Sequence, residues 1–214
     1  MKDAAQPHRA ARFWVPLLCL FTGSRPKEVM RLEVSELERH RDAWVLRVSS
    51  TMSADPKTGE AVTRWVPLHH ELVRCGFVAY VAQRKLDGHV KMFGPGAEAE
   101  TLSASSHRVS YWFSRLAQAL GLGQECNLHA LRWAFIAACL HSGIGIERIR
   151  LLAGRMAEVP ESLRALPPPP CNTEALDHAD GWVRQLRFDG LELSHLYVDE
   201  PLGRADEVFQ TKQP

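Results

Sequence analysis

Several features that would place a chain in a familiar class are missing from this sequence. No window approaches the roughly 18 consecutive apolar residues of a membrane span. The N-terminal stretch MKDAAQPHRAARFWVPL lacks the apolar core and cleavage site of a secretion signal. The five cysteines are dispersed and never form a C-x-x-C pair, so neither a disulfide framework nor a thiolate zinc site is indicated. We therefore expect a soluble, cytoplasmic protein.

The charge of the chain is nearly balanced overall but unevenly distributed. The formal net charge is +1, yet residues 1–155 carry 21 Lys and Arg against 14 Asp and Glu, whereas residues 156–214 carry 5 against 11. A basic body can bind a polyanion, and an acidic tail can dock on that body or on a neighbouring copy. A solvated surface of uneven charge would give the same counts, so charge alone does not decide between these alternatives.

Apolar periodicity predicts a mainly α-helical fold with one small antiparallel β-hairpin. The alternating stretches AWVLRVSS and AVTRWVPL are joined by the turn KTGE, which places Lys57 at the tip of the hairpin. The expected helices cover approximately residues 9–21, 25–32, 69–85, 106–121, 128–143, 145–154 and 174–188.

A run of four prolines, residues 167–170, divides the chain. Proline lacks a backbone N–H donor, so this run favours an extended arm over a helix or a sheet. We expect a core over residues 1–155, a proline-rich linker or insertion over 156–172, and a C-terminal helix with an acidic tail over 173–214.

One arginine occupies an electrostatically poor position in the stretch FTGSRPKEVMRL. Gly23 is suited to end the first helix in a left-handed turn, Ser24 to cap the next helix, and Pro26 to stand in its first turn. Arg25 then lies at the positive end of a helix dipole, which is unfavourable unless an anion is also bound. The alternative is a simple ion pair with Glu28.

A second basic pair opens the helix that Asn127 is suited to cap. His129 and Arg132 are three residues apart and therefore share one face of that helix. Two guanidinium groups, from Arg25 and Arg132, would neutralise one phosphate with paired hydrogen bonds, and Lys57 is a candidate proton donor to the same site. The alternatives are a structural His129 that bonds to the helix backbone and an ordinary turn lysine at position 57.

Taken in order, these residues resemble the motifs of the tyrosine recombinase family, the phage-integrase type of site-specific recombinase. The resemblance covers approximately residues 10–155 and implies the DNA breaking-rejoining fold of the family's catalytic domain, mainly α with a small antiparallel sheet. The matching blocks are Thr22, Gly23, Arg25 and Glu28, then KTG at Lys57 with the following RWVPL, then His129, Leu131 and Arg132, and finally SGIGIERIRLLAGR.

The resemblance implies an enzyme acting on double-stranded DNA. In this family a tyrosine hydroxyl attacks a phosphodiester to give a 3′-phosphotyrosine, so neither ATP nor a metal or other cofactor is implied. Arg25 and Arg132 would stabilise the negative charge of the transition state. His129 would assist proton transfer and Lys57 would protonate the leaving oxygen.

Two positions depart from the family's pattern. The second histidine of the family falls on Arg155, which can contact phosphate but cannot shuttle protons near neutral pH. No tyrosine stands in VPESLRAL, where the nucleophile is expected, and family order leaves Tyr197, 42 residues beyond Arg155. Either residues 156–172 are an insertion and Tyr197 is the nucleophile, or the nucleophile has been lost and Tyr197 is a packing residue.

Three functions follow from these observations. The chain is a recombinase of a mobile element, a degenerate relative that keeps the phosphate clamp and binds DNA without cutting it, or an interaction protein whose tail forms a homo-oligomer. The chain begins almost directly at the catalytic core, so the N-terminal DNA-clamping domain typical of the family is expected to be absent.

Overall fold

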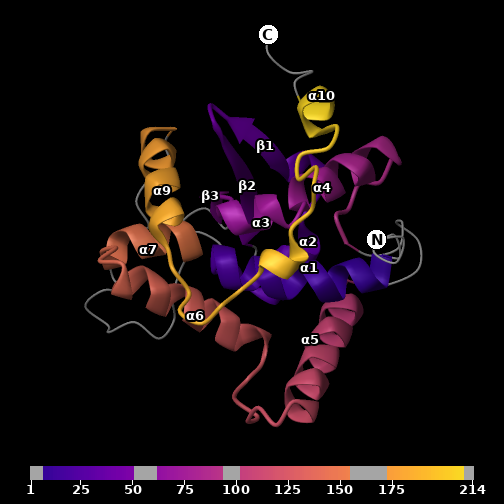
Figure 1. Cartoon of the computed structure of the whole chain (residues 1–214), viewed down its shortest axis with the longest axis vertical. Coiled ribbons are helices and arrows are strands. Elements are labelled where there is room, and N and C mark those ends of the chain that lie inside the picture. The colour runs from indigo at the N-terminus through magenta and orange to yellow at the C-terminus, as the bar shows by residue number, and fades with distance from the viewer. Residues whose placement is uncertain (1–6, 51–61, 94–101, 155–172, 210–214) are drawn as a thin grey trace.

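The computed structural model describes residues 7–50, 62–93, 102–154 and 173–209. These residues form a mainly helical domain with one three-stranded antiparallel sheet, as Figure 1 shows. This confirms the predicted fold class. In chain order, the elements are α1 (Pro7–Thr22), α2 (Pro26–Arg31), η2 (Val34–Glu36), β1 (Leu37–His40), β2 (Ala43–Ser50), β3 (Val62–Pro67), α3 (His70–Arg74), α4 (Phe77–Leu86), α5 (Leu102–Ala119), α6 (Leu128–His141), α7 (Ile146–Ala153), α9 (Thr173–Gln185), η4 (Ser194–Leu196) and α10 (Ala205–Phe209).

The sheet has the strand order β1-β2-β3, with β2 in the middle. The register pairs Leu46 of β2 with Leu37 of β1 and with Val66 of β3, so three buried apolar residues line up across one face. Such cross-strand apolar contacts stabilise an antiparallel sheet. The predicted hairpin of β2 and β3 is confirmed, but its tip, including Lys57, lies outside the described residues.

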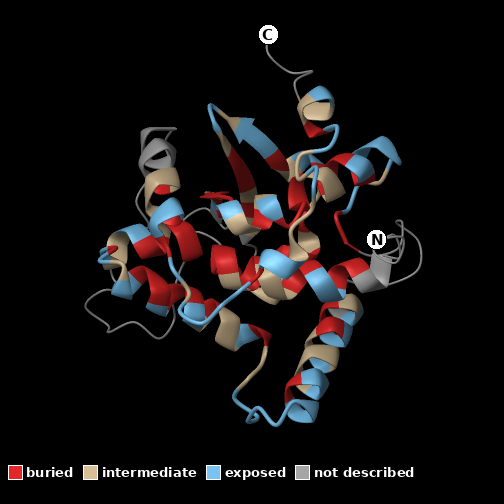
Figure 2. Cartoon of the chain, in the orientation of Figure 1, coloured by how far each residue is buried: buried red, intermediate tan, exposed pale blue. Residues whose placement is uncertain are grey.

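The first helix lies in the middle of the core. Figure 2 shows buried residues along α1. Val15, Leu18 and Phe21 of α1 are fully buried, and α6 contributes the fully buried Phe135. Burying a side chain of this kind contributes about 1.5–3 kcal/mol. Because α1 packs on α2, α5 and α6, it fixes where the next segment, the turn into α2, meets α6.

Gly23 makes that turn possible. Its φ of +63° ends α1 in the left-handed conformation that the sequence predicted. A Cβ at this position would also collide with the ring of Phe135. Any other residue would therefore strain the backbone and disturb the contact between α1 and α6.

Ser24 does not cap α2, contrary to the sequence expectation. Arg25 itself occupies the N-cap position, with extended backbone, and Pro26 follows as the first helical residue. The backbone N–H of Ser24 donates to Thr22 Oγ1 at 3.2 Å, so it takes no part in α2 either. The Ser24 hydroxyl is instead bonded to a buried arginine described below.

Three elements differ from the sequence prediction. The helix expected over 69–85 is two helices, α3 and α4, because Gly76 has a φ of +86° and packs against Val198. Strand β1 was not predicted, since LERH has one apolar residue in four. The short helix α10 was not predicted either, and it packs on α4.

The C-terminal segment docks on its own domain. The backbone N–H of Val198 donates to Arg74 O at 3.1 Å, and Arg39 pairs with Asp206 of α10 at 2.6 Å. None of the described helices is long and apolar enough to span a membrane. The proposed linker over 156–172 lies outside the described residues.

Candidate functional site

Arg25 stands at the start of α2, and its side chain is 24% exposed. Its backbone N–H donates to Glu28 Oε2 at 2.8 Å, and its Nη1 donates to Glu28 Oε1 at 3.2 Å. The ion pair with Glu28 that the sequence offered as an alternative is therefore present. It does not account for the site alone, because Glu28 is shared with a second arginine.

That second arginine is Arg64 of β3, which sequence reasoning missed. Its side chain is 4% exposed, and Nη2 lies 2.8 Å from Glu28 Oε2. The strand pattern could have revealed that Arg64 is buried. Arg64 and Val66 are two residues apart in β3, so their side chains point to the same, buried face of the sheet. A buried arginine needs partners, and that requirement predicts a carboxylate or carbonyl oxygens nearby.

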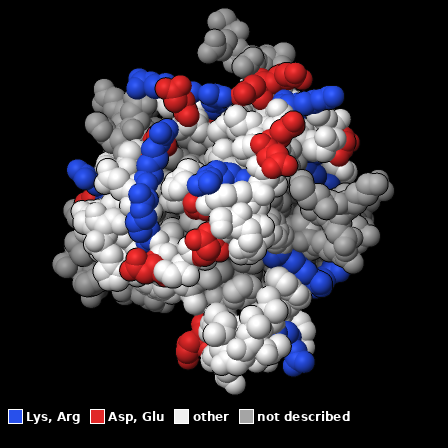
Figure 3. All heavy atoms as spheres, in the orientation of Figure 1, with Lys and Arg blue, Asp and Glu red and all other residues white. Residues whose placement is uncertain are grey.

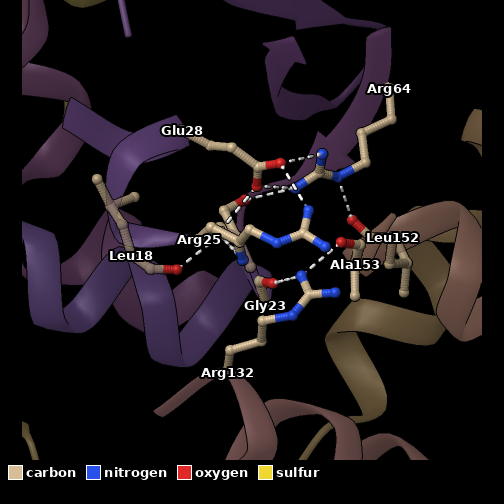
Figure 4. A network of polar contacts seen from close by, with 10 residues as sticks. Leu18, Gly23, Arg25, Glu28, Arg64, Arg132, Leu152 and Ala153 are labelled. Atoms are coloured by element: carbon tan, nitrogen blue, oxygen red, sulfur yellow. Dashed lines mark hydrogen bonds and ion pairs between the residues drawn. The ribbon is translucent and has the colours of Figure 1, made fainter. Parts of the chain in front are cut away.

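Arg132 of α6 lies in the same cluster (Figure 4), and only 2% of its surface is exposed. Its Nη1 donates to Gly23 O and, at 2.6 Å, to Ala153 O at the end of α7. Burial, followed by the charges of Arg25 and Arg64, lowers the pKa of Arg132 to about 10. The group still carries its charge at neutral pH.

Glu28 is the carboxylate within this cluster, and it is 5% exposed. Burial by itself would raise its pKa, but the charge and hydrogen bonds of Arg64, followed by those of Arg25, lower the pKa to about 2. Two guanidinium groups, those of Arg25 and Arg64, thus contact one carboxylate, and the third, that of Arg132, lies beside them (Figure 4). With three arginines and one glutamate, the cluster carries a net positive charge. An anion is the ligand that such a cluster would stabilise.

His129 lies on the first turn of α6, one turn before Arg132, and is exposed. The predicted cap is confirmed: Asn127 Oδ1 accepts from the backbone N–H of His129 at 2.9 Å and from that of Ala130 at 3.1 Å. The histidine ring therefore stands at the solvent side of the helix that brings Arg132 into the cluster. Its role in proton transfer stays a prediction.

Tyr197 is placed elsewhere. Its hydroxyl donates to the Glu71 carboxylate of α3, at 2.7 and 2.9 Å from the two oxygens, and the Arg74 guanidinium lies 3.8 Å from its ring centre. The bond to Glu71 raises the pKa of the phenol. The structure thus brings Arg25 and Arg132 together, but the contacts of Tyr197 are with α3. Lys57 and Arg155 lie outside the described residues.

The fold and the arginine cluster together define a class: the chain has the fold of a phage integrase, as the sequence motifs predicted. The solved structure of an integrase from mycobacterium phage Brujita matches it with a TM-score of 0.54 and 17% sequence identity. The match covers 94% of this chain and 57% of that chain, so this chain spans little more than half the length of that integrase. No model of a known protein family matches the sequence, and a search of curated proteins found no match.

Proposed function

We propose that this chain binds the phosphate backbone of double-stranded DNA through Arg25 and Arg132. The observation that carries the proposal is the cluster of three arginines and one glutamate, with its net positive charge, in a chain with an integrase fold. Guanidinium groups bind phosphate with paired charge-assisted hydrogen bonds, and phosphate is the repeating charge of DNA.

The three arginines of the cluster differ in how far they are exposed to solvent. Arg25 is the most exposed, so it would contact the phosphate directly, while Arg132 and Arg64 would supply positive charge from behind it. His129, exposed on α6, would contribute a further donor. The face drawn in Figure 3 carries both basic and acidic side chains, so the electrostatic argument rests on the arginine cluster rather than on this face as a whole.

The same proposal includes binding without strand cleavage. Its support is the placement of Tyr197, whose hydroxyl bonds to Glu71 rather than to an arginine of the cluster. Cleavage through Tyr197 would require residues around η4 to leave α3, and the bond to Glu71 raises the pKa of the phenol, which opposes its ionisation. The recombinase reaction, with a 3′-phosphotyrosine, is the second candidate, and the integrase fold is the observation that favours it.

The binding experiment uses the full chain and a fluorescein-labelled duplex of random sequence. Fluorescence anisotropy between about 50 and 200 mM salt should show affinity falling steeply with salt. Arg25→Ala should weaken binding about tenfold, since it removes a charge-assisted contact. The control is Arg39→Ala, whose side chain is more exposed than that of Arg25, 39% against 24%, and pairs with Asp206 outside the cluster. Equal affinities for wild type, Arg25→Ala and Arg132→Ala would refute the proposal.

The cleavage experiment uses a duplex with a nick, so that a cut strand cannot be rejoined. We expect no covalent protein–DNA adduct on a denaturing gel. An adduct that disappears in Tyr197→Phe but persists in Tyr111→Phe would overturn the binding-only proposal and establish a recombinase with a displaced nucleophile.

An interaction role of the tail is the third candidate, and the contact between Arg39 and Asp206 is the observation that favours it. In this structure the tail docks within one chain. If tails are exchanged between copies, the full chain should elute from gel filtration as a dimer or larger species. A chain ending at residue 193 should then elute as a monomer.

A further inference from the structure

We infer that Arg64 is the positioning residue of the phosphate site, acting on Arg25 through Glu28 and on Arg132 through the end of α7. The inference rests on the proposed DNA binding and extends it to Arg64, which stands in the RWVPL block but was given no role from the sequence. Arg64 is 3% exposed, so it acts through its neighbours rather than by touching DNA.

The first step concerns the hydrogen bonds of the Arg64 guanidinium, which connect β3 to three other parts of the chain. Its Nη2 donates to Glu28 Oε2 at 2.8 Å and to Ser24 Oγ at 3.1 Å, and its Nε donates to Leu152 O at 2.8 Å. Strand β3 is thereby tied to the turn after α1, to α2 and to the C-terminus of α7. Each bond uses a different direction of one planar group, which a lysine cannot reproduce.

The second step is the way Glu28 divides its oxygens. Oε2 accepts from Arg64 Nη2 and from the backbone N–H of Arg25, and Oε1 accepts from Arg25 Nη1 at 3.2 Å and from Arg64 Nη1 at 3.4 Å. Arg64 therefore holds the carboxylate in the orientation that receives Arg25. Without Arg64, Arg25 would be the remaining cation in contact with this carboxylate among the described residues. The guanidinium of Arg25 would then turn inward toward the carboxylate and away from an incoming phosphate.

The third step is at the end of α7, where consecutive carbonyl groups accept from the two buried arginines. Leu152 O accepts from Arg64, and Ala153 O accepts from Arg132. The C-terminus of a helix is its negative end, so these carbonyls favour the charged form of both side chains. Gly154 follows with a φ of +77°, and a Cβ there would lie 3.2 Å from Arg64 Nη1. Arg64 and Arg132 are thus placed by the same helix end.

The test compares Arg64→Lys with Arg84→Lys in the full chain, using the fluorescein-labelled random duplex. Arg84 of α4 is also a buried arginine, 7% exposed, and lies outside the cluster, where it donates to Lys91 O at 2.9 Å. Both substitutions keep the charge and should lower the melting temperature. Arg64→Lys should weaken DNA binding about tenfold, as expected for loss of a positioned charged contact, whereas Arg84→Lys should leave affinity unchanged.

A double-mutant cycle then separates positioning from independent binding. If Arg64 acts through Arg25, Arg64→Lys should cause a much smaller loss of affinity in the Arg25→Ala background than in the wild type. Equal losses in both backgrounds would overturn the inference, and so would wild-type affinity in Arg64→Lys.

The outcomes also distinguish this inference from the proposed function. Loss of binding in Arg25→Ala and Arg132→Ala, together with wild-type binding in Arg64→Lys, would leave the function standing and remove the positioning role. Wild-type binding in all three variants would remove both. Should Arg64→Lys fail to fold, Ser24→Ala removes one of the Arg64 bonds and keeps every charge; it should weaken DNA binding, and unchanged affinity would overturn the inference.

Discussion

The arginine cluster and the C-terminal segment are held to the domain in different ways. Arg64 and Arg132 are almost fully buried and bond to groups of α2, of α7 and of the turn between α1 and α2. The segment around Tyr197 lies across α3 and α4, and its polar contacts involve the part-buried Glu71 and the exposed pair Arg39 and Asp206. Removing part of the cluster should therefore cost much stability, and removing a tail contact little. The arginine cluster, the proposed phosphate site, is fixed by the core, whereas the candidate nucleophile Tyr197 is held by contacts that are easily exchanged.

The largest effect is expected for Arg132→Ala. This change removes the buried donor to Gly23 O and Ala153 O, and at about 1–3 kcal/mol for each unsatisfied acceptor the free energy of unfolding should fall by about 2–6 kcal/mol. Urea denaturation measures it. Arg115→Ala, on the exposed part of α5, is the control and should change stability little. A loss below about 1 kcal/mol for Arg132→Ala would contradict the assignment of the cluster to the core.

A somewhat smaller loss of stability is expected when acid protonates Glu28. The pKa of Glu28 is about 2 in the folded protein against a model-peptide value of 4.5. A carboxyl with a lowered pKa contributes stability that is complete above its unfolded pKa and is lost as pH falls toward the folded one. This contribution is on the order of 3 kcal/mol.

The measurement is the free energy of unfolding between pH 6 and pH 3 in wild type and Glu28→Gln. The wild type should lose stability below about pH 4.5, and Glu28→Gln should start lower and lose less over the same range. Glu125→Gln, at an exposed position, is the control and should follow the wild type. Parallel curves for wild type and Glu28→Gln would show that Glu28 keeps an ordinary pKa.

The next largest loss of stability is expected for Gly23→Ala, with Gly121→Ala as its comparison. Both glycines have positive φ, +63° and +73°, but only the Cβ at position 23 meets a neighbour, the ring of Phe135. Backbone strain alone should cost about 1 kcal/mol at position 121, and collision should add at least as much at position 23. Thermal unfolding measures both. Equal losses of stability in the two variants would mean that α6 shifts away from the new Cβ at position 23 without an energetic cost.

The smallest effect is expected for Tyr197→Phe, which removes the hydrogen bonds to Glu71. Amide hydrogen exchange should become faster in residues 194–209, while exchange in α1 and α6 should stay as in the wild type. Tyr111→Phe, exposed on α5, is the control. Faster amide exchange throughout the molecule would contradict the distinction between a fixed arginine cluster and a weakly held C-terminal segment.

Much of this arrangement was predictable from short-range patterns. Gly23, Arg25, Asn127 and Arg132 lie in local motifs whose turn and capping chemistry does not depend on the rest of the fold. The residues that sequence reasoning placed wrongly depend on distant partners. Ser24 has a capping side chain, but Arg64, 40 residues away, takes up its hydroxyl.

The break between α3 and α4 has a similar origin. Gly76 is compatible with a continuous helix in sequence terms, at a modest cost. In the structure it is the site where Val198 approaches the backbone, 122 residues along the chain, and that contact is invisible to periodicity. Strand β1 was missed because an edge strand of four residues shows too little alternation to be recognised.

The pairing of two consecutive carbonyls of α7 with two different arginines has a consequence for chain length. Each residue added to an α-helix turns its end by about 100° and advances it by about 1.5 Å. One residue inserted between Gly145 and Leu152 would therefore swing both acceptors away from Arg64 and Arg132 at once. The number of residues in α7 is constrained as strictly as the identity of the arginines, and an insertion there should abolish the site while every motif residue remains in place.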